Sequence, residues 1–158
     1  MISDASLKMI FVYAAYGRSM MAAHQLEQNL LAIVSSHPEK LPEKYTAEKV
    51  RKMTLGSLVN IFINCYSPPE ELVEELDNMI YFRNELAHRI SNFIVSTASS
   101  HKWHDEVISE LAEIESFFEE TNELLSPYIE ACYKKLNISK EKMNEIAFSL
   151  YPHLKRND

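Results

Sequence analysis

Residues 68–90 read PPEELVEELDNMIYFRNELAHRI, and this stretch decides the fold class. Its apolar residues recur every three or four positions, which is the spacing of one face of an α-helix. They are Leu72, Leu76, Met79, Ile80, Leu86 and Ile90. The two prolines and two acids suit the first turn of a helix, whose N–H groups attract negative charge. The stretch therefore predicts a long helix with one buried face.

The composition extends this prediction to an all-α fold, a bundle of four or five helices. Only Gly17 and Gly56 occur among 158 residues, whereas strands joined by tight turns need many positions with positive φ. The chain is 46% hydrophobic and 25% charged, which is ordinary for one soluble domain with a sizeable core. We expect a single helical domain over residues 1–158, with its core at about 4–151 and a frayed tail at 152–158.

The first half of the chain is expected to hold one long helix and two shorter ones. The long helix starts at Ser3 or Asp4 and ends at Ser36. In its first part Leu7, Ile10, Phe11 and Ala14 follow helical spacing. Gly17 stands in its middle, where it costs about 1 kcal/mol and marks a bend or a close approach of another helix. After a loop with two prolines at 37–45, Thr46 and Thr54 each start a shorter helix.

The second half carries the longest periodic segment, His101 to Lys135. Its apolar face holds Val107, Leu111, Ile114, Phe118, Leu125, Tyr128 and Cys132, with Thr121 filling the one gap. We expect Pro127 to kink this helix or to split it, because proline cannot donate the backbone hydrogen bond. Ser139 is predicted to cap a last helix that ends before Pro152.

Charge and cysteine usage restrict the class of protein and its compartment. The net charge of -7 argues against a protein that coats nucleic acid, although a local basic site remains compatible with it. Cys65 and Cys132 are isolated on apolar faces, which favours buried thiols in a reducing compartment over a disulfide. No secretory leader and no apolar run long enough to span a bilayer is recognisable. We therefore expect a cytoplasmic protein without a membrane segment.

Three polar residues interrupt the apolar pattern of the helix at 68–90. Arg83, Asn84 and His88 share one broad arc if each residue turns by about 100°, and Asn84 lies one turn before His88. Burying such groups is costly unless they are paired. One interpretation is structural, with Arg83 paired to a nearby acid and His88 hydrogen-bonded in the core; the other is a functional cluster.

The same residues resemble a known motif. Arg83-Asn84-Glu85-Leu86-Ala87-His88 resembles the arginine, four residues, histidine signature of the HEPN superfamily, with a polar residue after the arginine. The helical framework is similar too, and Thr54-Leu-Gly-Ser-Leu resembles a segment upstream of the motif in some small HEPN-like proteins. This resemblance implies a metal-independent endoribonuclease, often a toxin or anti-phage defence protein. It also implies a homodimer whose two motifs face each other across a two-fold axis, with no cofactor.

The residue types fit that chemistry. RNA is cut when its own 2′-hydroxyl attacks the neighbouring phosphate, and an imidazole exchanges protons near neutral pH. The resemblance gives His88 the acid-base role, Arg83 the role of holding the phosphate, and Asn84 an orienting role. Arg89 adds positive charge beside the motif.

A second basic region precedes the motif. Lys40, Lys44, Lys49, Arg51 and Lys52 place five of the sixteen Lys and Arg residues within thirteen positions. The simpler interpretation is a solvated loop and helix face. The alternative is a patch that contacts phosphates, in which Arg51 and Lys52 bind RNA.

Other interpretations of the whole chain and of one segment stay open. The protein can instead be a non-catalytic HEPN-like helical dimer that serves as a protein-interaction or regulatory module. An antitoxin or other regulatory protein is a further expected partner, but Ile90 stands where the two-component toxin branch usually has a tyrosine. His101, His104 and Asp105 have the spacing of metal ligands, but no further Cys or His pair completes a zinc set. Packing of Trp103 at a helix start explains that segment better.

Overall fold

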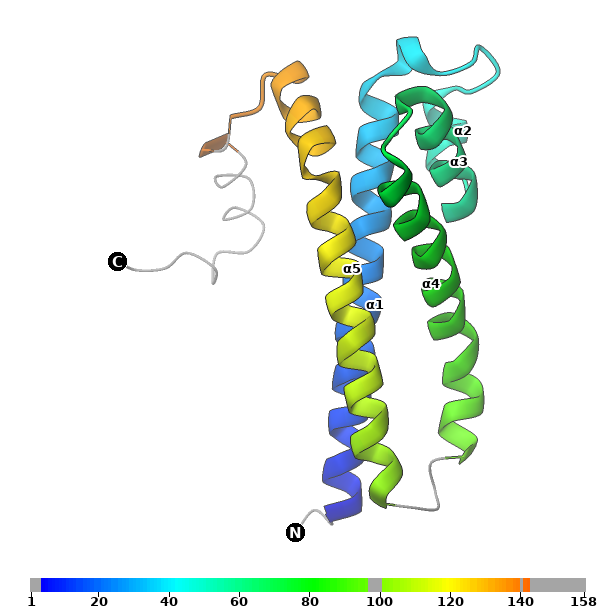
Figure 1. Cartoon of the computed structure of the whole chain (residues 1–158), viewed down its shortest axis with the longest axis vertical. Coiled ribbons are helices and arrows are strands. Elements are labelled where there is room, and N and C mark those ends of the chain that lie inside the picture. The colour runs from blue at the N-terminus through cyan, green and yellow to red at the C-terminus, as the bar shows by residue number, and fades with distance from the viewer. Residues whose placement is uncertain (1–3, 97–100, 140, 143–158) are drawn as a thin grey trace.

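The computed structural model describes residues 4–96, 101–139 and 141–142, and these form helices joined by short loops (Figure 1). No strand occurs among them, so the predicted all-α class is confirmed. The elements are α1 (Asp4–Ser36), the 3-10 turn η1 (Pro38–Lys40), α2 (Ala47–Arg51), α3 (Leu55–Tyr66), α4 (Glu70–Ser96) and α5 (His101–Lys135). None of the described helices is long and apolar enough to cross a membrane.

The two longest helices, α1 and α5, run parallel and side by side (Figure 1). Lys8 pairs with Asp105 at 3.4 Å near their first turns. Asn29 donates a hydrogen bond to Asn122 at 2.6 Å farther along, and Ser36 lies 2.9 Å from the Cys132 sulfur near the end. Because the partners advance together along both helices, this pair forms the backbone of the fold.

Helix α4 runs antiparallel to α1, and α3 covers only one half of the bundle (Figure 1). The Tyr66 hydroxyl at the end of α3 donates to the Ile33 carbonyl near the end of α1. At the start of α3, a Cβ added to Gly56 would lie 3.9 Å from Cδ1 of Ile80 on α4. The 12 residues of α3 therefore make a four-helix bundle with the later part of α1, α4 and α5. Along the earlier part of α1, the described bundle consists of α1, α4 and α5.

The core follows the predicted stripes on α4 and α5. Leu72, Leu76, Met79 and Leu86 of α4 are buried, as are Val107, Leu111, Phe118, Leu125 and Cys132 of α5. Such burial removes roughly 1.5–3 kcal/mol of unfavourable hydration for each large side chain. The predicted helix starts are also confirmed, since the Thr46 and Thr54 hydroxyls accept from the N–H groups of Lys49 and Ser57.

The first part of α1 buries a different face from the one that its apolar residues suggest. Val12, Ala15 and Ser19 are buried there, whereas Leu7, Ile10, Phe11 and Ala14 are exposed. Both sides of this helix segment are therefore apolar, and periodicity alone does not tell which one meets the core.

Pro127 does not split α5, which continues as one helix to Lys135. Pro127 is exposed, so water can satisfy the carbonyl that loses its hydrogen-bond donor. The helix ends in a left-handed residue, Asn137, with φ of 53°. Ser139 then accepts from the Lys142 N–H as predicted, and the rest of the expected last helix and tail lie outside the described residues.

Candidate functional site

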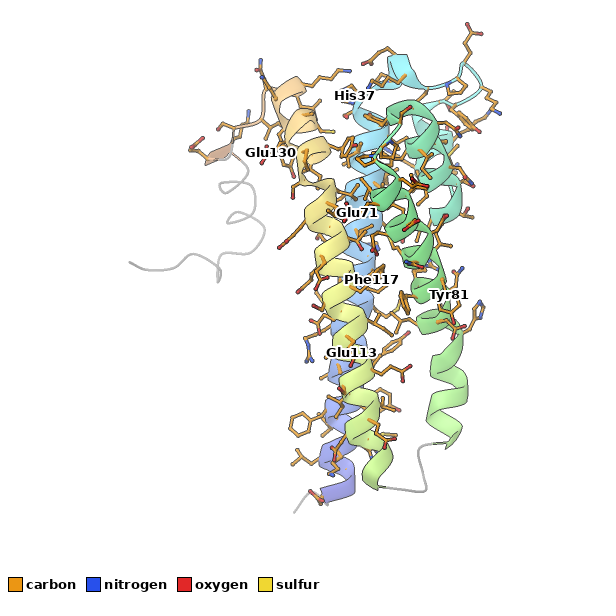
Figure 2. The ribbon with its side chains drawn as sticks, viewed as in Figure 1. His37, Glu71, Tyr81, Glu113, Phe117 and Glu130 are labelled. Atoms are coloured by element: carbon orange, nitrogen blue, oxygen red, sulfur yellow. The ribbon has the colours of Figure 1, made fainter. Side chains whose placement is uncertain are left out.

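The predicted cluster of Arg83, Asn84 and His88 lies on α4, beyond the part of that helix that runs beside α3 (Figure 1). Asn84 and His88 are both exposed, one turn apart on the outer side of the helix. Tyr81, which is 58% exposed, precedes them on this side (Figure 2). His88 is therefore not a core histidine, and it can meet a ligand from solvent.

Arg83 is half-buried and lies on another side of α4. Five residues turn an α-helix by about 140° net, so Arg83 and His88 leave the helix axis in different directions. Among the described residues Arg83 forms no ion pair or hydrogen bond, and the suggested pairing with Glu75, Asp77 or Glu85 is not seen. One subunit thus offers an unpaired guanidinium and an exposed imidazole on separate sides of one helix.

Tyr16 of α1 supports the backbone of the motif from the inside. Its hydroxyl donates to the carbonyl of Leu86 at 3.3 Å. Burial raises the pKa of Tyr16, so the hydroxyl keeps the proton that it donates. Local sequence patterns give no signal for this contact, because the two residues lie 70 positions apart.

The opposite flank of the motif is held by aromatic packing against α5. The Phe82 and Phe117 rings lie 5.0 Å apart between centroids, and Figure 2 shows Phe117 on the side of α5 that faces α4. Edge and offset contacts of this kind add roughly 0.5–1.5 kcal/mol beyond area burial. Tyr16 and Phe82 together fix the direction in which Arg83, Asn84 and His88 leave α4.

The predicted RNA-binding residues lie in two places. Arg89 follows His88 in α4, and its side chain is outside the described part. Arg51 and Lys52 lie at the end of α2, exposed and apart from the motif. Lys52 pairs with Glu48 at 2.7 Å, whereas Arg51 forms no ion pair or hydrogen bond with a described residue.

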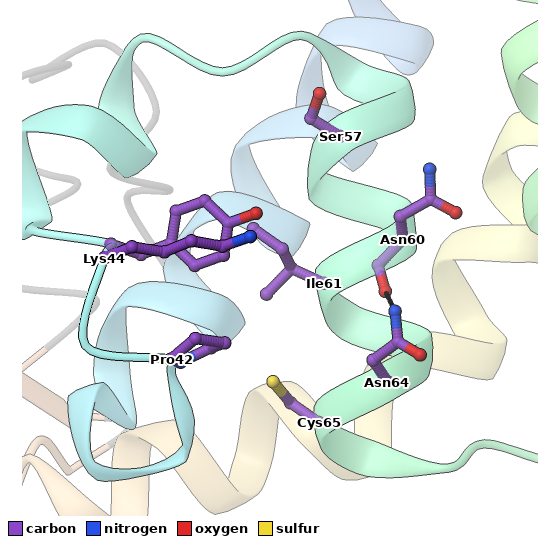
Figure 3. Close-up of a pocket in the computed structure, with 8 residues that line it drawn as sticks. Pro42, Lys44, Ser57, Asn60, Ile61, Asn64 and Cys65 are labelled. Carbon is purple, nitrogen blue, oxygen red and sulfur yellow. Dashed lines mark hydrogen bonds between the residues drawn. The ribbon is translucent and has the colours of Figure 1, made fainter.

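Beside α2, a cavity of about 360 Å³ opens between the loop after η1 and α3 (Figure 3). It is lined by Pro42, Lys44, Tyr45, Ser57, Asn60, Ile61, Asn64 and Cys65. The Lys44 ammonium lies 4.9 Å from the centre of the Tyr45 ring. The Asn64 amide donates to the Asn60 carbonyl at 2.7 Å, on the α3 side. An ammonium, an aromatic ring and amides suit a polar, anionic ligand better than an apolar one.

Acidic residues share the outer face of α4 with the motif. Glu74 and Asp77 are exposed there, about two turns and one turn before Tyr81, respectively. The face therefore changes along the helix from acidic to neutral and then to the imidazole. A polyanion approaching His88 meets less repulsion from the motif end of α4 than from its first turns.

A metal site is not assembled by the described side chains, where no group of three His, Cys, Asp or Glu residues is placed to hold an ion. His104 is buried, while Asp105 is exposed and pairs with Lys8. The His101 side chain lies outside the described part. Cys65 and Cys132 are free thiols.

Comparison with protein-family models, with curated proteins and with solved structures finds no match for this chain. What the site can do follows from its own side chains. They provide an exposed imidazole and amide, a guanidinium on another side of the same helix without a partner among the described residues, and basic residues on a separate helix.

Proposed function

We propose that this protein is a metal-independent endoribonuclease of the HEPN toxin or anti-phage defence type, acting in the cytoplasm as a homodimer. The observation that carries the proposal is the exposure of Asn84 and His88 beside an Arg83 that pairs with no described acid. Asn84 and His88 can meet a ligand from solvent, whereas the half-buried Arg83 has lost part of its hydration without gaining a described acid, a cost that a bound phosphate would offset.

The reaction needs one base, one acid and one cation. The His88 imidazole takes the proton of the RNA 2′-hydroxyl, and the 2′-oxygen attacks the adjacent phosphorus. The bond from phosphorus to the 5′-oxygen breaks, and that oxygen takes a proton from an imidazolium. The products are a 2′,3′-cyclic phosphate and a 5′-hydroxyl end. Arg83 stabilises the negative charge on the phosphoryl oxygens, and the Asn84 amide orients the ribose or the imidazole.

The placement of Arg83 and His88 on different sides of α4 supports a requirement for two subunits. Two motifs that face each other across a two-fold axis let the guanidinium of one copy work with the imidazole of the other. They also supply a second imidazole as the acid. Two copies double the local cationic charge in a protein whose net charge is -7.

The basic region around α2 fits the role of holding RNA away from the reacting phosphate. Arg51, Lys52 and Arg89 supply charge, and the cavity lined by Lys44 and Tyr45 offers a ring for a base to stack on. An antitoxin or other regulatory protein would act by covering the same surface.

The test is cleavage of a mixed RNA in the presence of a chelator. We expect the natural protein to cut, and His88→Ala and Arg83→Ala to lose cutting by roughly 10²-fold or more while keeping their helical circular dichroism. Asn78→Ala, at an exposed uncharged residue of the same helix, is the matched control. Equal cutting by all variants would reveal a contaminating nuclease and remove the proposal.

The second candidate function is a non-catalytic helical dimer that serves as a protein-interaction or regulatory module. The acidic Glu74 and Asp77 on the face of the motif favour it, because they repel a polyanion. Cleavage assays on a set of different RNAs distinguish the two candidate functions. A module binds a basic protein partner through this face and leaves RNA intact, and the Asp77→Ala change then weakens that binding.

A further inference from the structure

Tyr81 of α4 is an exposed aromatic side chain that the proposed reaction does not use. It is 58% exposed, and among the described side chains from α2 to α4 no other large apolar one is exposed. A single exposed apolar side chain is ordinary on a protein surface. What Tyr81 does therefore depends on the side chains beside it and on how its ring is held.

Tyr81 lies in line with His88 on the outer side of α4. Seven residues turn a helix by about 700°, so the two side chains leave the axis within about 20° of each other and roughly 10 Å apart along it. Asn84 lies between them, about 60° from Tyr81 on one flank. The helix thus presents a ring, an amide and an imidazole in succession, all exposed to solvent.

A chain of aromatic contacts holds the Tyr81 ring against the bundle. Its centroid lies 5.4 Å from that of Phe82, with the two rings at 69°. Phe82 lies 5.0 Å from Phe117 of α5, which in turn contacts the fully buried Phe118 at 5.6 Å. Phe82 can cover one face of the Tyr81 ring at most, and Figure 2 shows Tyr81 on the side of α4 away from Phe117. The ring is therefore restrained before a ligand arrives, which reduces the entropy lost on binding.

We propose that Tyr81 stacks on the base of the nucleotide whose 2′-hydroxyl attacks in the proposed reaction. Base, ribose and phosphate follow one another in a nucleotide as Tyr81, Asn84 and His88 follow one another along α4. With the base on Tyr81, the ribose comes beside the Asn84 amide and its 2′-hydroxyl comes towards the His88 imidazole. Every base has a π face, so Tyr81 selects an unpaired nucleotide rather than a particular sequence.

The acids beside Tyr81 favour one path for the phosphate. Asp77 lies one turn before Tyr81, and Glu85 lies one turn after it, on the flank opposite to Asn84. Both carboxylates repel a phosphate, whereas an uncharged base can lie between them. The phosphate is therefore least disfavoured beyond Asn84, on the flank nearer to Arg83.

The inference rests on the proposed function, because it assigns a position to the base of the nucleotide on which His88 acts. Its test is fluorescence anisotropy of short RNAs in the His88→Ala background, with each nucleotide in turn replaced by an abasic one. We expect Tyr81→Ala to weaken the binding of intact RNA by roughly tenfold, and one abasic position to weaken binding equally when Tyr81 is present. Both changes together should weaken binding no further, since each removes one half of the same contact.

Two further variants separate stacking from a role in folding or assembly. Tyr81→Trp keeps an aromatic face and should bind intact RNA at least as tightly as the protein with tyrosine does. Tyr13→Ala, at a 46% exposed tyrosine of α1, is the matched control and should leave binding unchanged. Light scattering on the same samples should show that Tyr81→Ala keeps the particle size of the natural protein.

Additive losses from Tyr81→Ala and from every abasic position overturn the inference, as does RNA binding that Tyr81→Ala leaves unchanged. A changed particle size of Tyr81→Ala also overturns it, because the ring then serves a contact between subunits. Cleavage by proteins that keep His88 distinguishes the inference from the proposed function. Non-additive binding without cleavage supports the role of Tyr81 and removes the ribonuclease. Cleavage at an unchanged rate by Tyr81→Ala removes the role of Tyr81 alone, and the absence of RNA binding removes both.

Discussion

The hydroxyl of Tyr66 lies 2.9 Å from Nδ1 of His37, at the end of the bundle where α1, α3 and α5 meet. The same hydroxyl donates to the Ile33 carbonyl at 2.8 Å, and the Tyr66 ring stacks on Phe62 at 5.2 Å between centroids. The last turn of α3 is thereby joined to the last turn of α1. This junction lets a helix of 12 residues hold its place beside one of 33.

The first prediction concerns the stability at high pH. Burial, with a smaller effect from the nearby Cys132 and Cys65 thiols, raises the pKa of Tyr66 from 10.0 to about 12. The folded protein therefore holds this proton more tightly than the unfolded chain does. The resulting stabilisation is complete below pH 10 and is lost as the pH rises towards 12. Thermal melts across this range should show the loss.

The Tyr66→Phe variant gives the control for that prediction. It removes the ionisable group, so its phenolate absorbance titration should lack the last-titrating tyrosine of the natural protein. Tyr81→Phe, at an exposed tyrosine, is the matched control and should keep the last-titrating group. A natural protein whose tyrosines all ionise together near their ordinary pKa would contradict the described junction.

The second prediction concerns Tyr16, which positions the motif without reaching its outer face. Tyr16→Phe removes the bond to the Leu86 carbonyl and should lower the unfolding free energy by about 0.5–1.5 kcal/mol. If the protein cuts RNA, the turnover number should also fall while substrate affinity is kept. Tyr133→Phe, at a tyrosine of α5 that is also half-buried, is the matched control and should leave both quantities unchanged. An equal effect of both variants would mean that the hydrogen bond holds nothing in place.

The third prediction tests the close contact of α1 with α5. Ser19 is fully buried, and its hydroxyl lies 2.8 Å from the Leu111 carbonyl and 3.1 Å from the Ala15 carbonyl. Ser19→Ala should lower the unfolding free energy by about 1 kcal/mol through the lost hydrogen bond. Ser19→Val should lower it by roughly 1–3 kcal/mol more, because extra volume separates the two helices. Denaturant unfolding measures both, and the exposed Ser35→Ala should change little. A valine variant as stable as the alanine variant would show that the helices can move apart at no cost.

Helix positions could be predicted from the sequence because their signals are local. Thr46, Thr54 and Ser139 accept the capping hydrogen bonds expected of them, and the spacing on α4 and α5 identifies their buried faces. The predicted split at Pro127 does not occur, because Pro127 lies on an exposed side where an interrupted hydrogen bond is tolerated, and a kink there stays a prediction.

Contacts between distant helices were not predictable in the same way. Leu7 and Ile10 follow helical spacing but are exposed, since Val12 and Ala15 offer a second apolar face and only packing selects between them. Tyr16 contacts the motif from 70 positions away in the sequence. The parallel pairing of α1 with α5 was not predictable either, because helical periodicity does not show which helices lie side by side. For the candidate site, the 140° between Arg83 and His88 follows from helical spacing alone, whereas the exposure of His88 and the lack of a described partner for Arg83 needed coordinates.

The last prediction uses Arg51 and Lys52, two neighbouring exposed cations that differ in one respect. Lys52 is paired with Glu48, and Arg51 has no described partner. If RNA passes α2, Arg51 contacts a phosphate without first breaking an ion pair. In a His88→Ala background, which separates binding from cutting, Arg51→Ala should weaken binding of single-stranded RNA. It should also reduce the slope of log affinity against log salt concentration by about 0.7. Lys52→Ala should have a smaller effect, and Lys135→Ala, paired with Glu39 outside the basic region, should have none. Equal slopes for all of these proteins would place the RNA path elsewhere on the molecule.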